Sequence, residues 1–221
     1  MSFIQEVRAR AAKSPKKIVL PESDDSRTME ALEYILDNKI ARIILIGKSG
    51  VADKIKSSNR KDLEIIDPEK YNDIDKMASE YYELRKAKGM TVEEAAKCVR
   101  EDYLTFGGLL VRRDEADGFV AGATHTTANT VRAALRCLKI DKSIGVVAGS
   151  FLMEVPNSVY GEKGVFIFAD CGVNPEPNAR QLAGIAVLSA DLFKQLVGAV
   201  PRVAFLSYSS KGSAAGPLVD K

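Results

Sequence analysis

The stretch "KKIVLPESDDSRTMEALEYILDNKIARIILIG", residues 16–47, predicts the fold class of the chain. It opens with a short apolar run, residues 16–20, that ends at Pro21, and it closes with a second apolar run, residues 41–47. Between the two runs lies an acidic, capped start followed by apolar residues at helical spacing: Met29, Leu32 and Ile35. Strands that alternate with helices favour an α/β fold with a parallel sheet covered on both faces.

The same alternation continues to about Asp141. Residues 63–66 and 117–122 are further strand patterns, and residues 74–88 form a helical block that stops at Gly89. A new helix starts at Thr91, where Glu94 three positions later completes a capping box. We expect one more helix near residues 103–113, broken or closely packed at its two glycines, Gly107 and Gly108.

After Asp141 the pattern changes, and we place a domain boundary there, with residues 1–141 as a first α/β domain and residues 142–221 as part of a second. Two long apolar runs, "SIGVVAGSFLMEVP" and "GVFIFAD", are separated by a turn-rich segment and favour an antiparallel strand pair. A helix over residues 177–197 and a strand "RVAFLSY" over residues 202–208 follow.

Composition excludes several classes of function. The 221 residues are 46% hydrophobic and 28% charged with a net charge of +2, and the basic residues are scattered, which argues against a nucleic-acid partner. No run is long enough to span a bilayer. One histidine and three separated cysteines make a metal site or a disulfide framework improbable. We therefore expect a cytoplasmic protein without a bound metal.

The segment "GATHTTANTVRAALR", residues 122–136, is the main candidate for an anion site. It joins a strand to a helix and contains the single histidine, His125, together with Thr126, Thr127 and Asn129, which could cap the helix and donate hydrogen bonds. Arg132 is expected in the first helical turn, where a cation is unfavourable unless an anion binds beside it. Taken alone, His125 fits a structural role better than a catalytic one.

Two other regions repeat this chemistry. Arg27 also stands at a helix start after a strand, whereas Arg85 sits at a helix C-terminus, where a cation is favourable without a ligand. The segment "SYSSKGSAAGP" follows the expected strand and holds Lys211, Gly212 and Ser213 in an order that is not a Walker A loop. A flexible polar loop and a ligand-binding loop explain that segment about equally well.

Five motifs, in this order, resemble phosphate acetyltransferases, which group with phosphate butyryltransferases: "PESDDSRTMEAL", "YYELRKAKGMT", "GATHTTANTVRAALR", "FIFADCGVNPEP" and "LSYSSKGSA". The resemblance covers the whole chain and is closer to the acetyl enzymes. It implies transfer of an acetyl group between acetyl phosphate and coenzyme A, which is a co-substrate and not a permanently bound cofactor. It also implies a homodimer and a two-domain fold like that of isocitrate and isopropylmalate dehydrogenases, with a mixed sheet in the second domain.

The resemblance also implies roles for residues. Arg132 would contact the phosphate or the acyl carbonyl as the catalytic residue, and Arg27 and Arg85 would bind coenzyme A or phosphate. The acyl phosphate pocket would be formed by the remaining candidates: His125, Thr126, Thr127, Asn129, Lys211, Gly212 and Ser213. Members of the family continue beyond the position of Lys221 with a serine–arginine pair and an aspartate tied to thiol deprotonation, so these 221 residues are expected to bind inorganic phosphate and related ligands weakly and to turn over poorly.

Other functions remain open at this point. The chain could be a module that binds acetyl-CoA or an acyl phosphate without catalysis, or it could prefer butyryl substrates. A dehydrogenase of the isocitrate type is weaker, because neither an acidic metal-binding constellation nor a G-x-G-x-x-G after a strand is present.

Overall fold

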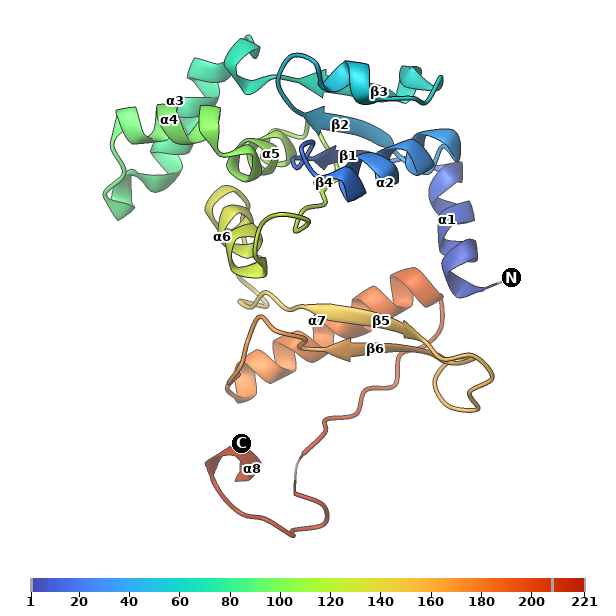
Figure 1. Cartoon of the computed structure of the whole chain (residues 1–221). Coiled ribbons are helices and arrows are strands. Elements are labelled where there is room, and N and C mark those ends of the chain that lie inside the picture. The colour runs from blue at the N-terminus through green and yellow to red at the C-terminus, as the bar shows by residue number, and fades with distance from the viewer. Residues whose placement is uncertain (1, 208, 221) are drawn as a thin grey trace. The chain divides into compact units, whose positions relative to one another are not determined.

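A computed structural model describes residues 2–207 and 209–220, which divide into two compact units, Ser2–Lys139 and a second unit from Ile140 onward (Figure 1). The first unit is built on a sheet of four parallel strands in the order β3-β2-β1-β4. The strands are β1 (Lys17–Leu20), β2 (Arg42–Ile46), β3 (Leu63–Ile66) and β4 (Gly118–Phe119). The expected parallel sheet is confirmed, although β4 is shorter than its sequence pattern.

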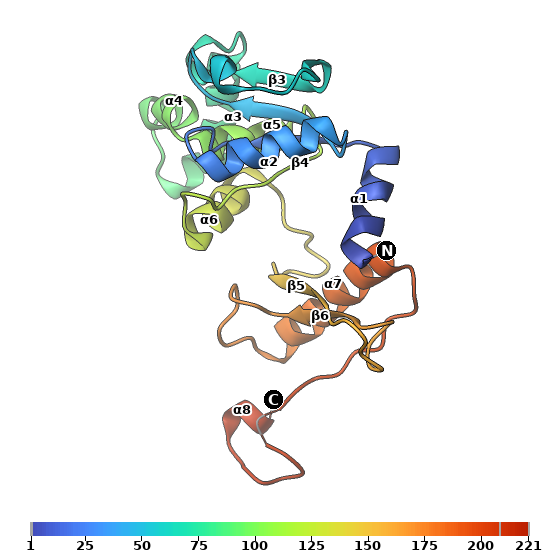
Figure 2. The same ribbon diagram turned by 45° about the vertical axis from the view of Figure 1, so that its right-hand side comes forward.

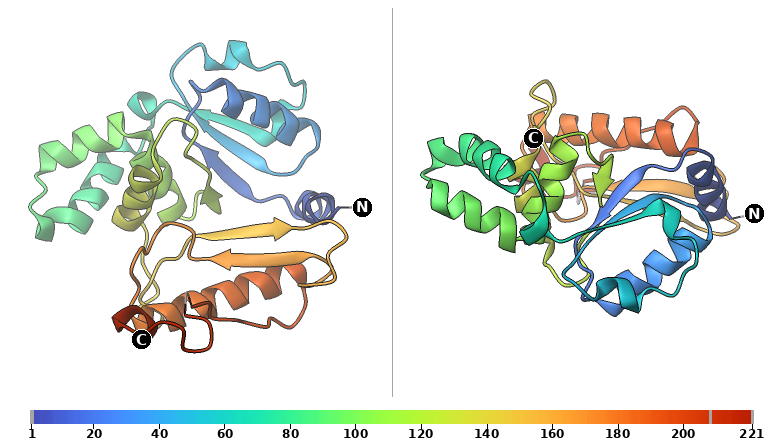
Figure 3. Two further views of the ribbon diagram at one scale, coloured as in Figure 1. Left: turned by 60° about the horizontal axis from the view of Figure 1, so that its bottom comes forward. Right: turned by 90° about the horizontal axis from the view of Figure 1, so that it is seen from above.

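Alternation along the strands gives each sheet face its own core. Leu20, Ile43 and Leu45 pack with Leu32 and Leu36 of α2 (Ser26–Asp37), which covers one face. The other face, which includes Val19, Ile44 and Ile46, is covered by α3 (Ile74–Arg85), α4 (Val92–Glu101) and α5 (Tyr103–Arg112). Figure 3 shows α2 and this second group of helices on opposite sides of the sheet. Buried apolar residues on both faces are what a parallel sheet requires.

The predicted start of α4 and the predicted end of the helical block before it are confirmed by their caps. Thr91 accepts a hydrogen bond from the Glu94 amide, and the Glu94 carboxylate accepts one from the Thr91 amide, so α4 has the expected capping box. Gly89 adopts a left-handed conformation with φ of 84° and ends the helical block that contains α3. The N-terminal helix α1 (Phe3–Lys13) begins with a second capping box at Ser2 and was not anticipated.

Close packing at two glycines sets the position of α6 (Thr127–Cys137). A Cβ added at Gly107 would lie 3.2 Å from Val19, and one added at Gly108 would lie 3.0 Å from the Cβ of Cys137 on α6. Small residues therefore bring α5 against the sheet on one side and against α6 on the other. The expected close packing at Gly107 and Gly108 is confirmed.

The second unit pairs a hairpin with one helix. Strands β5 (Ser150–Glu154) and β6 (Val165–Ala169) are antiparallel, and α7 (Ala179–Val197) packs against the hairpin mainly through β6 (Figure 2). A short helix, α8 (Pro217–Asp220), follows later, and four 3-10 turns complete the first unit: Val51–Lys54, Arg60–Asp62, Pro68–Lys70 and Lys86–Lys88.

Two expectations for the second unit need correction. Its described sheet has two antiparallel strands and is not mixed. The segment "RVAFLSY" forms no strand over residues 202–207, and Tyr208 lies outside the described residues. Phe205 is 65% exposed and Leu206 is 94% exposed, because no neighbouring strand supplies the backbone hydrogen bonds that would hold this segment in a sheet. Within the described residues no helix is long and apolar enough to cross a membrane.

Candidate active site

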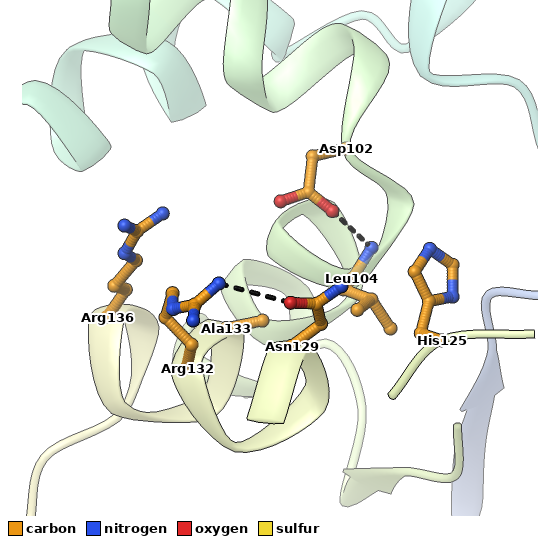
Figure 4. Close-up of a pocket in the computed structure, with 7 residues that line it drawn as sticks. All are labelled: Asp102, Leu104, His125, Asn129, Arg132, Ala133 and Arg136. Carbon is orange, nitrogen blue, oxygen red and sulfur yellow. Dashed lines mark hydrogen bonds between the residues drawn. The ribbon is translucent and has the colours of Figure 1, made fainter. Parts of the chain in front are cut away.

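A pocket of about 200 Å³ lies where the chain enters α5 and α6. Figure 4 shows Arg132 and Arg136 rising from neighbouring turns of α6, with His125 at the far end of the row and Asp102 across the pocket. The full lining is Asp102, Leu104, His125, Asn129, Arg132, Ala133 and Arg136. The structure therefore brings together His125, Asn129 and Arg132, three of the residues singled out in the sequence.

A second pocket of about 330 Å³ shares Asp102 and His125 with the first. Its lining is mostly acidic: Pro21, Glu22, Asp24, Asp25, Glu101, Asp102, Tyr103, Thr124 and His125. His125 thus stands between a basic pocket and an acidic one, at the carboxyl end of β1, where ligands bind in parallel α/β sheets.

The two arginines of the basic pocket are cations without a carboxylate partner. Arg132 donates a 3.0 Å hydrogen bond from Nη1 to Oδ1 of Asn129, and neither Arg132 nor Arg136 forms an ion pair within residues 2–207 and 209–220. Like charges four residues apart on a helix repel by roughly 0.2–0.5 kcal/mol. An anion bound between them would remove this repulsion.

The start of α6 differs from the sequence expectation. The Thr126 hydroxyl accepts a 3.2 Å hydrogen bond from the Asn129 amide, so Thr126 is the cap and Thr127 is the first helical residue. Arg132 consequently lies in the second turn and not in the first, where the helix dipole acts most strongly. Arg132 therefore remains a candidate for anion binding because it lines the same pocket as Arg136.

The loop before α6 is held by Glu22, which sequence reasoning did not single out. The side chain of Glu22 is 2% exposed, it accepts hydrogen bonds from the backbone amides of residues 122–125, and its Oε1 lies 2.7 Å from Nδ1 of His125. Burial raises the pKa of Glu22, but these hydrogen bonds outweigh it and hold the pKa well below its usual range. The sequence signal that could have identified Glu22 is an acidic residue two positions after the end of a buried strand.

Arg27 lies in the first turn of α2 beside this loop, as predicted. Its guanidinium forms a two-pronged contact with Asp25, at 3.0 Å from Nε and 2.8 Å from Nη2, and it also donates to the carbonyl of Ala123. Asp25 raises the pKa of the Arg27 guanidinium and offsets the unfavourable helix position. The Arg27 side chain is 70% exposed, so its outer face is open to a ligand.

Arg85 is the last residue of α3, as predicted, but it is not among the residues that line either pocket. Its Nε is buried without a hydrogen-bond partner. Neither of these two pockets therefore joins Arg85 to His125 and Arg132.

Lys211, Gly212 and Ser213 belong to the second unit and form a tight turn. Lys211 and Gly212 have φ of 51° and 80°, and the Ser210 amide donates to the Ser213 hydroxyl at 3.0 Å. The contact of these residues with a phosphate stays a prediction.

The motif "FIFADCGVNPEP" has a structural explanation in Asp170. Its carboxylate accepts hydrogen bonds from the amides of Gly149, Gly172, Val173 and Asn174. Burial raises the pKa of Asp170, yet these bonds lower it to about 2. Asp170 therefore organises the loop that follows β6.

The thiols near the first unit's pocket are poor nucleophiles. Burial raises the pKa of Cys137 to about 12 and also raises that of Cys98. The thiolate is the reactive form of cysteine, so neither side chain is suited to covalent catalysis. In the described part of the chain, no group of three or more His, Cys, Asp or Glu residues is arranged to hold a metal ion.

The sequence of the chain was compared with those of known protein families. A sequence model described as "Phosphate acetyl/butaryl transferase" matches residues 2–221. The chain belongs to this family of transferases.

Several phosphate acetyltransferases are close relatives within the family. The chain is 47% identical over 225 residues to the phosphate acetyltransferase of Thermoanaerobacterium thermosaccharolyticum, covering 100% of this chain and 67% of that protein. It is 39% identical to the phosphate acetyltransferase of Escherichia coli, covering 100% of this chain and 30% of that protein. A phosphotransacetylase from Streptococcus pyogenes superposes with a TM-score of 0.86 at 37% identity, covering 99% of this chain and 65% of that one. The chain thus spans about two thirds of the length of the first and third of these relatives.

Proposed function

We propose that this phosphate acetyl/butaryl transferase family member acts in acetyl transfer between acetyl phosphate and coenzyme A. The observation that carries the proposal is the pocket in which Arg132 and Arg136 lie beside His125 and Asn129 and form no ion pair with any residue that the structure describes. The names of its relatives, which are phosphate acetyltransferases, support the same reaction.

The chemistry of this transfer suits such a pocket. The coenzyme A thiolate attacks the carbonyl carbon of acetyl phosphate, a carbon–sulfur bond forms, and the carbon–oxygen bond to phosphate breaks, so that inorganic phosphate leaves with the electron pair. Negative charge develops on the carbonyl oxygen and on the departing phosphate, and fixed hydrogen-bond donors stabilise both. No protein nucleophile is needed, which agrees with the inert thiols of Cys98 and Cys137. In this scheme Arg132 binds the phosphate, and Arg136 adds a second cation.

The test is to replace Arg132. Arg132→Ala should lower kcat/KM for acetyl phosphate about a hundredfold, as expected when a charged contact to a developing anion is lost. Arg132→Lys, which keeps the charge, should retain more activity. Arg42→Ala is the matched control, because Arg42 is exposed at the amino end of β2, away from the carboxyl ends of the strands. Thioester absorbance measures the rate, and calorimetry measures phosphate binding. Equal kinetics for Arg132→Ala and Arg42→Ala would refute the assignment.

The same assay separates the alternatives. Faster transfer from butyryl phosphate would make the chain a butyryltransferase, a substrate that the family description also covers. Binding of coenzyme A and phosphate that depends on Arg132, without any thioester formation, would indicate a binding module.

Further proposals concern the rest of the protein. We propose that residues 1–141 and 142–221 act as separate domains of a fold like that of isocitrate and isopropylmalate dehydrogenases, and that Lys211, Gly212 and Ser213 contribute to the acyl phosphate site. Arg27 and Arg85 would bind coenzyme A or phosphate, and Thr126 and Thr127 would help to form the acyl phosphate pocket. A cytoplasmic homodimer is proposed from the family resemblance, and sedimentation equilibrium of the purified protein tests the dimer.

A further inference from the structure

We propose that Glu22 is a positioning residue that keeps a proton on Nδ1 of His125 and thereby presents Nε2 of the ring to a phosphate oxygen of the ligand. The part concerning the ligand rests on the proposed function. The part concerning the ring does not, and it can be tested without any substrate.

The carboxylate of Glu22 is surrounded by donors. Oε2 accepts from the amides of Gly122 and Ala123, both at 2.8 Å. Oε1 accepts from the Thr124 amide at 2.9 Å, the Thr124 hydroxyl at 3.1 Å and the His125 amide at 2.9 Å, and it lies 2.7 Å from Nδ1 of the His125 ring. Both oxygens are thus used as acceptors on one loop.

This arrangement requires an ionised carboxylate. A protonated acid would point its own O–H at one of these N–H groups and leave a buried donor without an acceptor, which costs roughly 1–3 kcal/mol. Glu22 has its side chain only 2% exposed, so water does not replace the lost acceptor. The lowered pKa of Glu22 agrees with the geometry.

An ionised Glu22 determines the tautomer of His125. At 2.7 Å from a carboxylate oxygen, Nδ1 must carry the hydrogen, because a nitrogen lone pair at this distance would face a negatively charged oxygen. The Thr124 hydroxyl lies 3.3 Å from Nδ1, but it donates to Glu22 and therefore does not compete for this position.

The remaining ring nitrogen is the one available in the pocket. No hydrogen bond of Nε2 is present among the described residues, and the ring lines the same pocket as Arg132 and Arg136. When the ring is protonated, Nε2 donates to a phosphate oxyanion, and when the ring is neutral, Nε2 accepts from a P–OH group of the ligand. Because Nδ1 keeps its hydrogen in both states, the proton that the ring gains or loses is at Nε2.

A single histidine makes the test direct. The chain has one imidazole, so a ¹⁵N-labelled sample gives one pair of ring nitrogen signals. At a pH where the ring is neutral, we expect Nδ1 to be protonated and Nε2 to carry the lone pair. A neutral ring with the hydrogen on Nε2 would overturn the proposal, whether or not any variant folds.

Variants test the cause. Glu22→Gln replaces an acceptor by an NH₂ group and should shift the ring towards the Nε2–H tautomer. Thr124→Val removes a hydroxyl contact to Glu22 and leaves the charge in place, so the ring should keep its Nδ1–H form. Glu30→Gln, at an exposed position on α2, is the control for lost charge. If Glu22→Gln folds and keeps the Nδ1–H form, Glu22 does not set the tautomer and the proposal is wrong.

Inorganic phosphate tests the ligand-facing part. Its addition should shift the Nε2 signal more than the Nδ1 signal, and Glu22→Gln should weaken phosphate binding about tenfold, by analogy with the carboxylates that orient histidines in metal sites. Binding that needs Arg132 but leaves both ring signals unchanged would overturn this part alone. Absence of any Arg132-dependent phosphate binding would instead count against the proposed function.

Discussion

Each of the two units contains one carboxylate that gathers backbone amides at the end of a strand, and the two differ in what they hold. Glu22 follows β1 and binds a loop that ends in an imidazole, whereas Asp170 follows β6 and, within the described residues, binds backbone amides and the side chain of Asn174. Glu22 is almost fully buried, and Asp170 is partly exposed. A carboxylate that accepts several backbone amides therefore positions a pocket residue in the first unit, whereas in the second unit it fixes the conformation of a loop.

The largest effect is expected from deleting the buried carboxylate. Glu22→Ala should lower the free energy of unfolding of the first unit by about 3–5 kcal/mol, because several buried N–H groups lose their acceptor together. Denaturant unfolding followed by the NMR signals of residues 2–139 measures it. Glu30→Ala should change stability by less than about 0.5 kcal/mol. Equal losses in the two variants would mean that the loop finds other acceptors.

A smaller effect is expected in the second unit. Asp170→Ala should cost about 1–3 kcal/mol, since its partly exposed amides can turn to water when the carboxylate is gone. Asp191→Ala, at an exposed position on α7, is the control. A loss as large as that of Glu22→Ala would show that partial exposure of the carboxylate does not lessen its contribution.

The smallest effect is expected from acid. The fold lowers the pKa of Asp170 from 3.8 to about 2, so its contribution is present above about pH 4 and is lost as the pH falls towards 2. The loss should be about 1–2 kcal/mol, and it should be absent in Asp170→Asn. The pKa of Glu22 is lower still, so its contribution should persist to a lower pH. Unfolding curves between pH 6 and pH 2 measure both, and an unchanged acid slope in Asp170→Asn would contradict the assignment.

The sequence was informative where one local rule decides the structure. Alternating apolar runs located the strands, Thr91 and Glu94 located the start of α4, and Gly107 and Gly108 marked the contacts of α5. In each case the structure depends on residues that are close together in the sequence, so their pattern along the chain is enough to predict it. The segment over residues 122–136, singled out in the sequence, contributes His125, Asn129 and Arg132 to the pocket.

Long-range partners were not readable in the same way. Glu22 looks like a solvated loop residue until its partners, a hundred positions away, are known. Arg132 was placed in the wrong turn because several threonines competed as the cap, and the structure selects Thr126. The segment at residues 202–207 has the apolar pattern of a strand, but a strand also needs a neighbour to pair with.

The hydrogen bonds of Glu22 have a consequence for folding kinetics. They join positions 100–103 residues apart, and the Lys17 amide makes a further tie of the same span to Asp117 at 2.8 Å. Closing a loop of that length costs chain entropy before the contacts that it makes possible can stabilise the chain. Contacts of long sequence separation therefore slow folding. The pocket therefore has no precursor in a local segment of the chain. We infer that it forms late, in the same cooperative step that brings β4 beside β1.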